Sequence, residues 1–179
     1  MDALPGRHRF FFDATTANGT GEAITFASNF LTASKAGYGL EDHDNAVIIG
    51  LRHFATTFAF NDAIWAKYGG PLSERIAFKD PKTGVAPVVN VYQNTGYGTT
   101  LPNREQTLAM MAKRGVHFAL CDMATRAFAG LIAQKLSLRS ADVYEELKAS
   151  ALPNAHFAAA GIVAVNRAQE RGYAIQYIG

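Results

Sequence analysis

Apolar and polar positions along the chain follow two alternating patterns. Short runs of almost continuous apolar residues are typical of parallel strands buried on both faces, and residues 46–53 (AVIIGLRH) form the clearest one. Between such runs, apolar residues recur every three or four positions, which is the period of an amphipathic helix. We predict strands at 8–13, 46–53, 116–120, 155–158 and 173–177. In the first part of the chain we predict a helix that ends at Gly37 to Gly39, a helix at 54–68 and a helix from Asn103 to Gly115. In the remainder we predict a helix that begins near Asp122, a helix capped by Ser140 and a helix at 160–171.

Strands and helices alternate along the whole chain, which predicts an α/β fold. We expect a three-layer α/β/α sandwich with a mainly parallel five-stranded sheet. The 179 residues suit a single domain, 1–179, with a long loop insert at about 69–102 where turn-forming residues such as Gly70-Pro71 replace the periodic pattern. Because long loops in compact domains are often functional, we interpret the insert as an arm or lid.

Polar and reactive residues follow three of the predicted strands at their carboxyl ends. These ends share one edge of a parallel sheet, so Asp13, Arg52, His53 and Cys121 are candidate catalytic residues. A helix N-terminus and nearby cations favour a thiolate at Cys121, whereas the carboxylate of Asp122 opposes it. His53 is either a base or anion donor that Asp13 orients, or a strand-end histidine bonded to a backbone carbonyl. Cys121 is either reactive or packed and inert.

Two further segments carry candidate binding residues. Asn61, Trp65 and Tyr68 concentrate polar and aromatic groups, either as a substrate-binding pocket wall or as a helix edge whose aromatics make core or subunit contacts. Gly19-Thr20-Gly21 is a faint phosphate-loop signal that helix capping explains better.

Composition and charge exclude several function classes. The net charge of +2 with scattered basic residues is unlike a nucleic-acid-binding surface, and the apolar runs are too short to span a membrane. One cysteine forms no internal disulfide or cysteine-rich zinc cluster, and the five histidines lack metal-ligand spacing, so we expect neither a metal nor a cofactor. No export signal is visible, which favours the cytoplasm, or the periplasm if a leader was removed.

Two segments resemble the DsrE/DsrF-like proteins: 115–121 (GVHFALC), a strand that ends in cysteine, and the tail 160–173. The resemblance implies an α/β/α sandwich assembled as a homo-oligomer, a trimer or hexamer. It also implies that Cys121 carries a persulfide between sulfur donor and acceptor proteins. The insert and the lack of a second cysteine distinguish this chain from the small relay subunits.

The sequence therefore predicts a sulfur-handling protein, a persulfide carrier or sulfurtransferase-like enzyme that uses Cys121. The alternative is a non-catalytic protein of the same fold that binds a small ligand or serves as a subunit of an oligomeric assembly.

Overall fold

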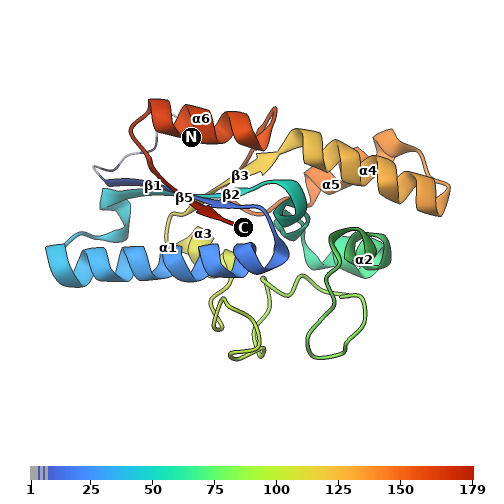
Figure 1. The fold of residues 1–179 in the computed structure, drawn as a ribbon, viewed down its shortest axis with the longest axis horizontal. Coiled ribbons are helices and arrows are strands. Elements are labelled where there is room, and N and C mark those ends of the chain that lie inside the picture. The colour runs from blue at the N-terminus through green and yellow to red at the C-terminus, as the bar shows by residue number, and fades with distance from the viewer. Residues whose placement is uncertain (1–3, 5, 7) are drawn as a thin grey trace.

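A five-stranded parallel sheet forms the centre of the molecule, as the sequence predicts (Figure 1). The computed structural model describes Leu4, Gly6 and residues 8–179. The strands lie in the order β4-β3-β2-β1-β5, and all neighbouring pairs are parallel. Their bounds are β1 His8–Ala14, β2 Asn45–Leu51, β3 His117–Cys121, β4 Ala155–Ala158 and β5 Ala174–Ile178. The sequence pattern therefore located every strand of the sheet, since parallel strands buried on both faces are almost continuously apolar.

Helices cover the two faces of the sheet unequally (Figure 1). One face carries α1 (Ala17–Tyr38), the 3-10 helix η2 (His53–Ala59), α2 (Asp62–Ile76) and α3 (Leu108–Lys113), and α6 (Gly161–Glu170) lies on the other. The helices α4 (Asp122–Leu136) and α5 (Ser140–Ala149) pack against each other beside the β3 and β4 side of the sheet, and the short η1 (Asp42–Asp44) precedes β2. No helix in the described residues is both long and apolar enough to cross a membrane.

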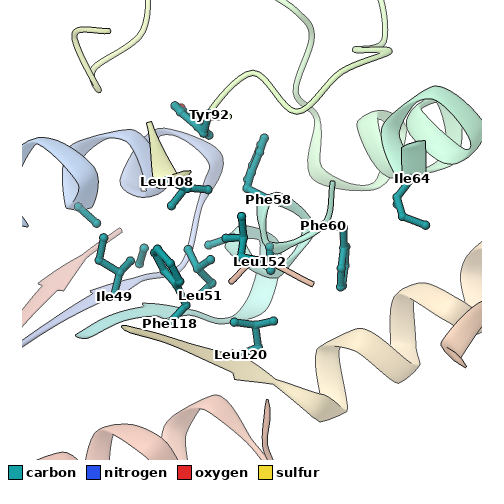
Figure 2. Close-up of a cluster of buried hydrophobic side chains, with 14 of the residues drawn as sticks. Ile49, Leu51, Phe58, Phe60, Ile64, Tyr92, Leu108, Phe118, Leu120 and Leu152 are labelled. Atoms are coloured by element: carbon teal, nitrogen blue, oxygen red, sulfur yellow. The ribbon is translucent and has the colours of Figure 1, made fainter. Parts of the chain in front are cut away.

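Adjacent residues of β1 contribute to two separate hydrophobic clusters. Phe12 joins the larger cluster with α1, η2 and α2, which Figure 2 shows around Phe58 and Leu51. Phe11 joins the smaller cluster beneath α6. This is the two-residue alternation of a strand. On the α6 side, Gly50 is required because an added Cβ would lie 2.5 Å from the Phe11 ring.

The predicted helix at 54–68 is two elements, and the second one continues further than the sequence suggested. η2 ends at Ala59, and α2 then runs through Gly69, Gly70 and Pro71 to Ile76. Gly69 does not break the helix; it is a contact point, because an added Cβ would lie 2.0 Å from the carbonyl oxygen of Pro87. The predicted insert at 69–102 therefore begins too early, and the irregular segment occupies 77–107.

The irregular segment is pinned to the core by Asn90 rather than projecting as a free arm. The buried Asn90 amide donates to the carbonyl oxygens of Phe58 and Phe60, each at 2.7 Å, and its Oδ1 accepts from the Tyr92 amide at 3.1 Å. Tyr92 is itself fully buried in the larger cluster. The end of the segment also differs from prediction, because Thr107 caps α3 in place of Asn103.

Two histidines on β3 and β4 face each other across the pair of strands. The Nδ1 atom of His117 lies 2.9 Å from the Nε2 atom of His156, and the ring centroids are 5.2 Å apart. Burial lowers the pKa of both imidazoles, and the neighbouring His156 lowers the pKa of His117 further. When both rings are neutral, one ring donates a hydrogen bond to the other. Two positively charged rings at this distance would repel each other.

We expect this histidine pair to make the protein less stable in acid. In the unfolded chain the imidazoles take up protons near their ordinary pKa of 6.5, whereas the folded pair resists protonation. The pair's contribution is therefore complete above that pH and is lost as the pH falls through the lower folded-state pKa values. Urea unfolding at neutral pH and at about pH 5 should show a smaller acid-induced loss when His117→Asn and His156→Asn are combined. The exposed His43, substituted to Asn, is the control, and an identical loss in wild type and double variant would contradict the prediction.

Asn90→Ala should lower the free energy of unfolding by about 2–3 kcal/mol, because the Phe58 carbonyl loses its side-chain donor and the Tyr92 amide its acceptor inside the core. Urea denaturation measures the change. Asn166→Ala, which removes an exposed hydrogen bond to Glu170, is the matched control and should change stability by less than about 0.5 kcal/mol. Equal effects of the two substitutions would show that Asn90 does not anchor the segment.

Candidate functional site

The carboxyl ends of β1, β2 and β3 meet at one edge of the sheet and bring Asp13, Arg52 and Cys121 together. The strand register aligns Asp13 with Gly50 and Gly50 with Ala119, so these three strands end side by side. The carbonyl oxygen of Thr15 accepts the backbone amides of Phe54 and Ala55 at 3.1 and 3.2 Å, which holds the start of η2 against the end of β1. The predicted convergence of strand ends is therefore present.

Asp13 and Arg52 form a bidentate ion pair. Arg52 Nε donates to Asp13 Oδ1 at 2.7 Å, and Arg52 Nη2 donates to Asp13 Oδ2 at 2.8 Å. The Asp13 side chain is 3% exposed and that of Arg52 is 24% exposed. The hydrogen bond to Asp13 raises the pKa of Arg52, although burial opposes this shift. The expectation that Asp13 orients His53 is replaced by this pairing, because Arg52 uses both carboxylate oxygens.

Cys121 ends β3 and caps α4. Its Sγ atom accepts a hydrogen bond from the backbone amide of Ala124 at 3.4 Å. The residue is 8% exposed and lies on the wall of a cleft of about 300 Å³. The lining consists of strand-end residues and of the first turns of α4 and α6: Arg52, His53, Cys121, Met123, Ala124, Ala160, Gly161 and Ile162. Two helix N-termini and one guanidinium thus line the same cleft as the thiol.

The N-terminus of α6 approaches the site closely because its first residue is glycine. An added Cβ at Gly161 would lie 2.4 Å from the Cβ of Arg52, so the helix packs directly on the aliphatic part of the arginine side chain. The Arg52 guanidinium carbon also lies 5.9 Å from the centre of the Tyr177 ring. These contacts fix the direction of the guanidinium.

Asp122, the carboxylate next to the thiol, is bound on the far side of α4. Its Oδ1 accepts from the Tyr144 hydroxyl at 2.5 Å, and its Oδ2 accepts from Arg126 Nε at 2.7 Å. Burial opposes ionisation of Asp122, but the hydrogen bonds from Tyr144 and Arg126 together lower its pKa. The negative charge that the sequence placed beside Cys121 is therefore compensated by a cation and a hydroxyl.

His53 has a left-handed backbone conformation, with φ of 55°, and its ring stacks on Phe54 with 4.1 Å between centroids. Among the described residues its imidazole has no hydrogen-bond partner. The ring lies between the thiol cleft and a second groove of about 410 Å³, whose other lining residues are Phe54, Arg75, Ala124, Ala127, Phe128, Leu131 and Gln134. Sequence reasoning missed this groove, one wall of which belongs to the helix that the sequence predicts from near Asp122.

The residues expected to bind substrate have structural contacts instead. Trp65 and Tyr68 are fully buried in the larger cluster, where Trp65 stacks on Phe58 with 5.2 Å between ring centroids. The Tyr68 hydroxyl donates to Glu146 Oε2 at 2.6 Å. Asn61 caps α2 by accepting the Ile64 amide at 3.3 Å. None of the three lines the thiol cleft.

The glycines of the faint phosphate-loop signal lie inside a helix. Gly19 and Gly21 belong to the first turn and a half of α1, and Thr16 caps this helix by accepting the Gly19 amide at 2.9 Å. Capping therefore accounts for the segment. In the part of the chain that the structure describes, no three His, Cys, Asp or Glu side chains gather as a metal-binding set.

Arg52→Met should destabilise the protein by about 3 kcal/mol, because it leaves the buried Asp13 carboxylate without a counterion. Combining Arg52→Met with Asp13→Asn should recover part of this loss, as measured by urea denaturation. Arg139→Met, which breaks the exposed pair with Asp142, is the matched control and should have little effect. A double variant less stable than Arg52→Met alone would contradict this account of the ion pair.

Comparisons with known proteins identify no relative. No family model matches the chain, and neither a curated protein nor a solved structure shows significant similarity to it. The site is therefore defined by its own geometry: one thiol at a strand end, bordered by an arginine, a histidine and two helix N-termini.

Proposed function

We propose that the protein handles sulfane sulfur, as a persulfide carrier or a sulfurtransferase-like enzyme whose nucleophile is Cys121. The single observation that carries the proposal is the position of the thiol, which lines a cleft where two helix N-termini and Arg52 favour negative charge. A thiolate is the reactive form of cysteine in sulfur chemistry.

In the first step, the Cys121 thiolate attacks the outer sulfur of a persulfide donor, R–S–SH. A new S–S bond forms to Cys121 while the donor's S–S bond breaks, and its electron pair leaves with R–S⁻. The products are Cys121–S–SH and a thiolate, so the exchange needs no external oxidant or reductant. The guanidinium and the helix dipoles at the cleft stabilise both the attacking thiolate and the departing R–S⁻.

In the second step, an acceptor thiolate attacks the outer sulfur of the Cys121 persulfide and restores the Cys121 thiolate. The chain has one cysteine, so this acceptor belongs to another molecule. His53 lines the same cleft as the thiol, and in both steps its imidazole supplies a proton or a hydrogen bond to the departing sulfur, the donor's in the first step and that of Cys121 in the second. Met123 and Ile162, both exposed, form an apolar rim on which a partner can rest.

The resemblance of 115–121 and 160–173 to DsrE/DsrF-like proteins supports the hypothesis that the chain shares the chemistry of that family. Under this hypothesis, donor and acceptor are proteins and the chain assembles as a trimer or hexamer. The aspartate is assigned an indirect role: Asp13 is a positioning residue that holds Arg52 at the cleft.

The groove beside His53 favours a second candidate, non-catalytic binding of a small ligand with an apolar body and an anionic group. Its walls are mainly apolar, and Arg75 lies over the Phe54 ring at 5.5 Å. In this case Cys121 is a packing residue, and the experiment below distinguishes the two candidates.

Incubation of the protein with a low-molecular-weight persulfide, followed by intact mass spectrometry, should show one added sulfur atom on the wild type. The addition should be removed by dithiothreitol and be absent from Cys121→Ser. His53→Gln should take up sulfur at least about tenfold more slowly if the imidazole supplies a proton. His43→Gln is the matched control, since this exposed histidine does not line the cleft.

A wild-type protein that takes up no sulfur, or takes up as much as Cys121→Ser, would exclude the sulfur-handling proposal and leave ligand binding. Sulfur uptake that is the same in His53→Gln and His43→Gln would retain Cys121 as the nucleophile and remove His53 from the reaction.

A further inference from the structure

We propose that His117 and His156 together bind one divalent transition-metal ion, of the Ni²⁺ or Cu²⁺ type, at the β3–β4 pair. The two imidazoles belong to adjacent strands and are 39 residues apart in sequence. They lie at the opposite end of β3 from the thiol, about 13 Å along the strand from Cys121. The site is therefore independent of the proposed sulfur chemistry.

The separation of the two ring nitrogens suits one metal ion. Imidazole nitrogens bind first-row divalent metals at about 2.0–2.1 Å, so two of them at a right angle around the ion are about 2.9 Å apart. The distance between His117 Nδ1 and His156 Nε2 is 2.9 Å. Right-angled neighbours occur in the square-planar and octahedral coordination of Cu²⁺ and Ni²⁺, and wider angles occur in the tetrahedral coordination of Zn²⁺.

The strands hold both ligands in place before the metal arrives. The β3–β4 register pairs Ala119 with His156 and Phe118 with Ala155, so the backbone carries the two imidazoles as neighbours. His156 is exposed and His117 partly exposed, so the rings have room to turn their lone pairs toward a common point. Two ligands on a fixed frame bind more tightly than either alone, since the second nitrogen binds in an intramolecular step.

Metal binding replaces the proton that the two rings share. In the free pair, one facing nitrogen carries a hydrogen and the other accepts it. When the metal binds, the donor ring moves this hydrogen to its other nitrogen, so both facing nitrogens present lone pairs and neither ring changes charge. No third His, Cys, Asp or Glu joins them in the described residues, so water occupies the remaining positions.

Calorimetric titration of the full-length, untagged protein with Ni²⁺ at neutral pH tests the site. Ni²⁺ is the probe because it does not oxidise the Cys121 thiol. The wild type should bind one ion, and His117→Asn and His156→Asn should each weaken binding by about tenfold or more. His43→Asn is the matched control, because it removes an exposed imidazole that has no second histidine beside it.

A spectroscopic measurement separates chelation from single-histidine binding. Cu²⁺ added to the Cys121→Ser protein should give an electron paramagnetic resonance spectrum with coupling to two imidazole nitrogens, and to fewer in His156→Asn. Both histidines are on the surface of the sheet, so the variants are expected to fold, which circular dichroism checks. Equal Ni²⁺ affinity of wild type and both variants, or coupling to a single imidazole in the Cys121→Ser protein, would overturn the proposal.

Discussion

The ion pair between Asp13 and Arg52 determines the character of the sheet edge at which the thiol lies. Asp13 is almost completely buried, and its charge is tolerable there only because Arg52 binds both carboxylate oxygens. The pairing holds the arginine across the ends of β1 and β2, where the first residue of α6 packs on its side chain. The ion pair thus places the guanidinium at the cleft, beside the N-terminus of α6.

The path of the chain explains why one face of the sheet carries much more structure than the other. The last two strands, β4 and β5, occupy opposite edges of the sheet, so the single helix between them has to cross one whole face. The small residues Ala164 and Ala168 let α6 lie close to the strands while it does so. The other face carries the larger core and the irregular segment 77–107, which Asn90 fastens to η2 on the side away from α6.

The two candidate chemistries occupy opposite ends of one strand. Cys121 ends β3 beside one guanidinium and two helix N-termini, an environment that suits anions. His117 begins β3 beside His156, where partial burial and mutual repulsion disfavour positive charge and leave nitrogen lone pairs available. The carboxyl end of β3 thus suits an anion, whereas its amino end favours neutral imidazole.

The order of residues alone predicts the parallel sheet, the positions of its strands and the meeting of Asp13, Arg52 and Cys121 at one edge. Buried strands and amphipathic helices have local patterns, and parallel topology places every carboxyl end together. Three features became visible only in the folded chain: Asp13 binds Arg52 rather than orienting His53, Trp65 and Tyr68 belong to the core, and α2 continues to Ile76. These outcomes depend on contacts between residues far apart in the chain, such as Gly69 with Pro87 and His117 with His156, and such contacts leave no periodic trace in the sequence.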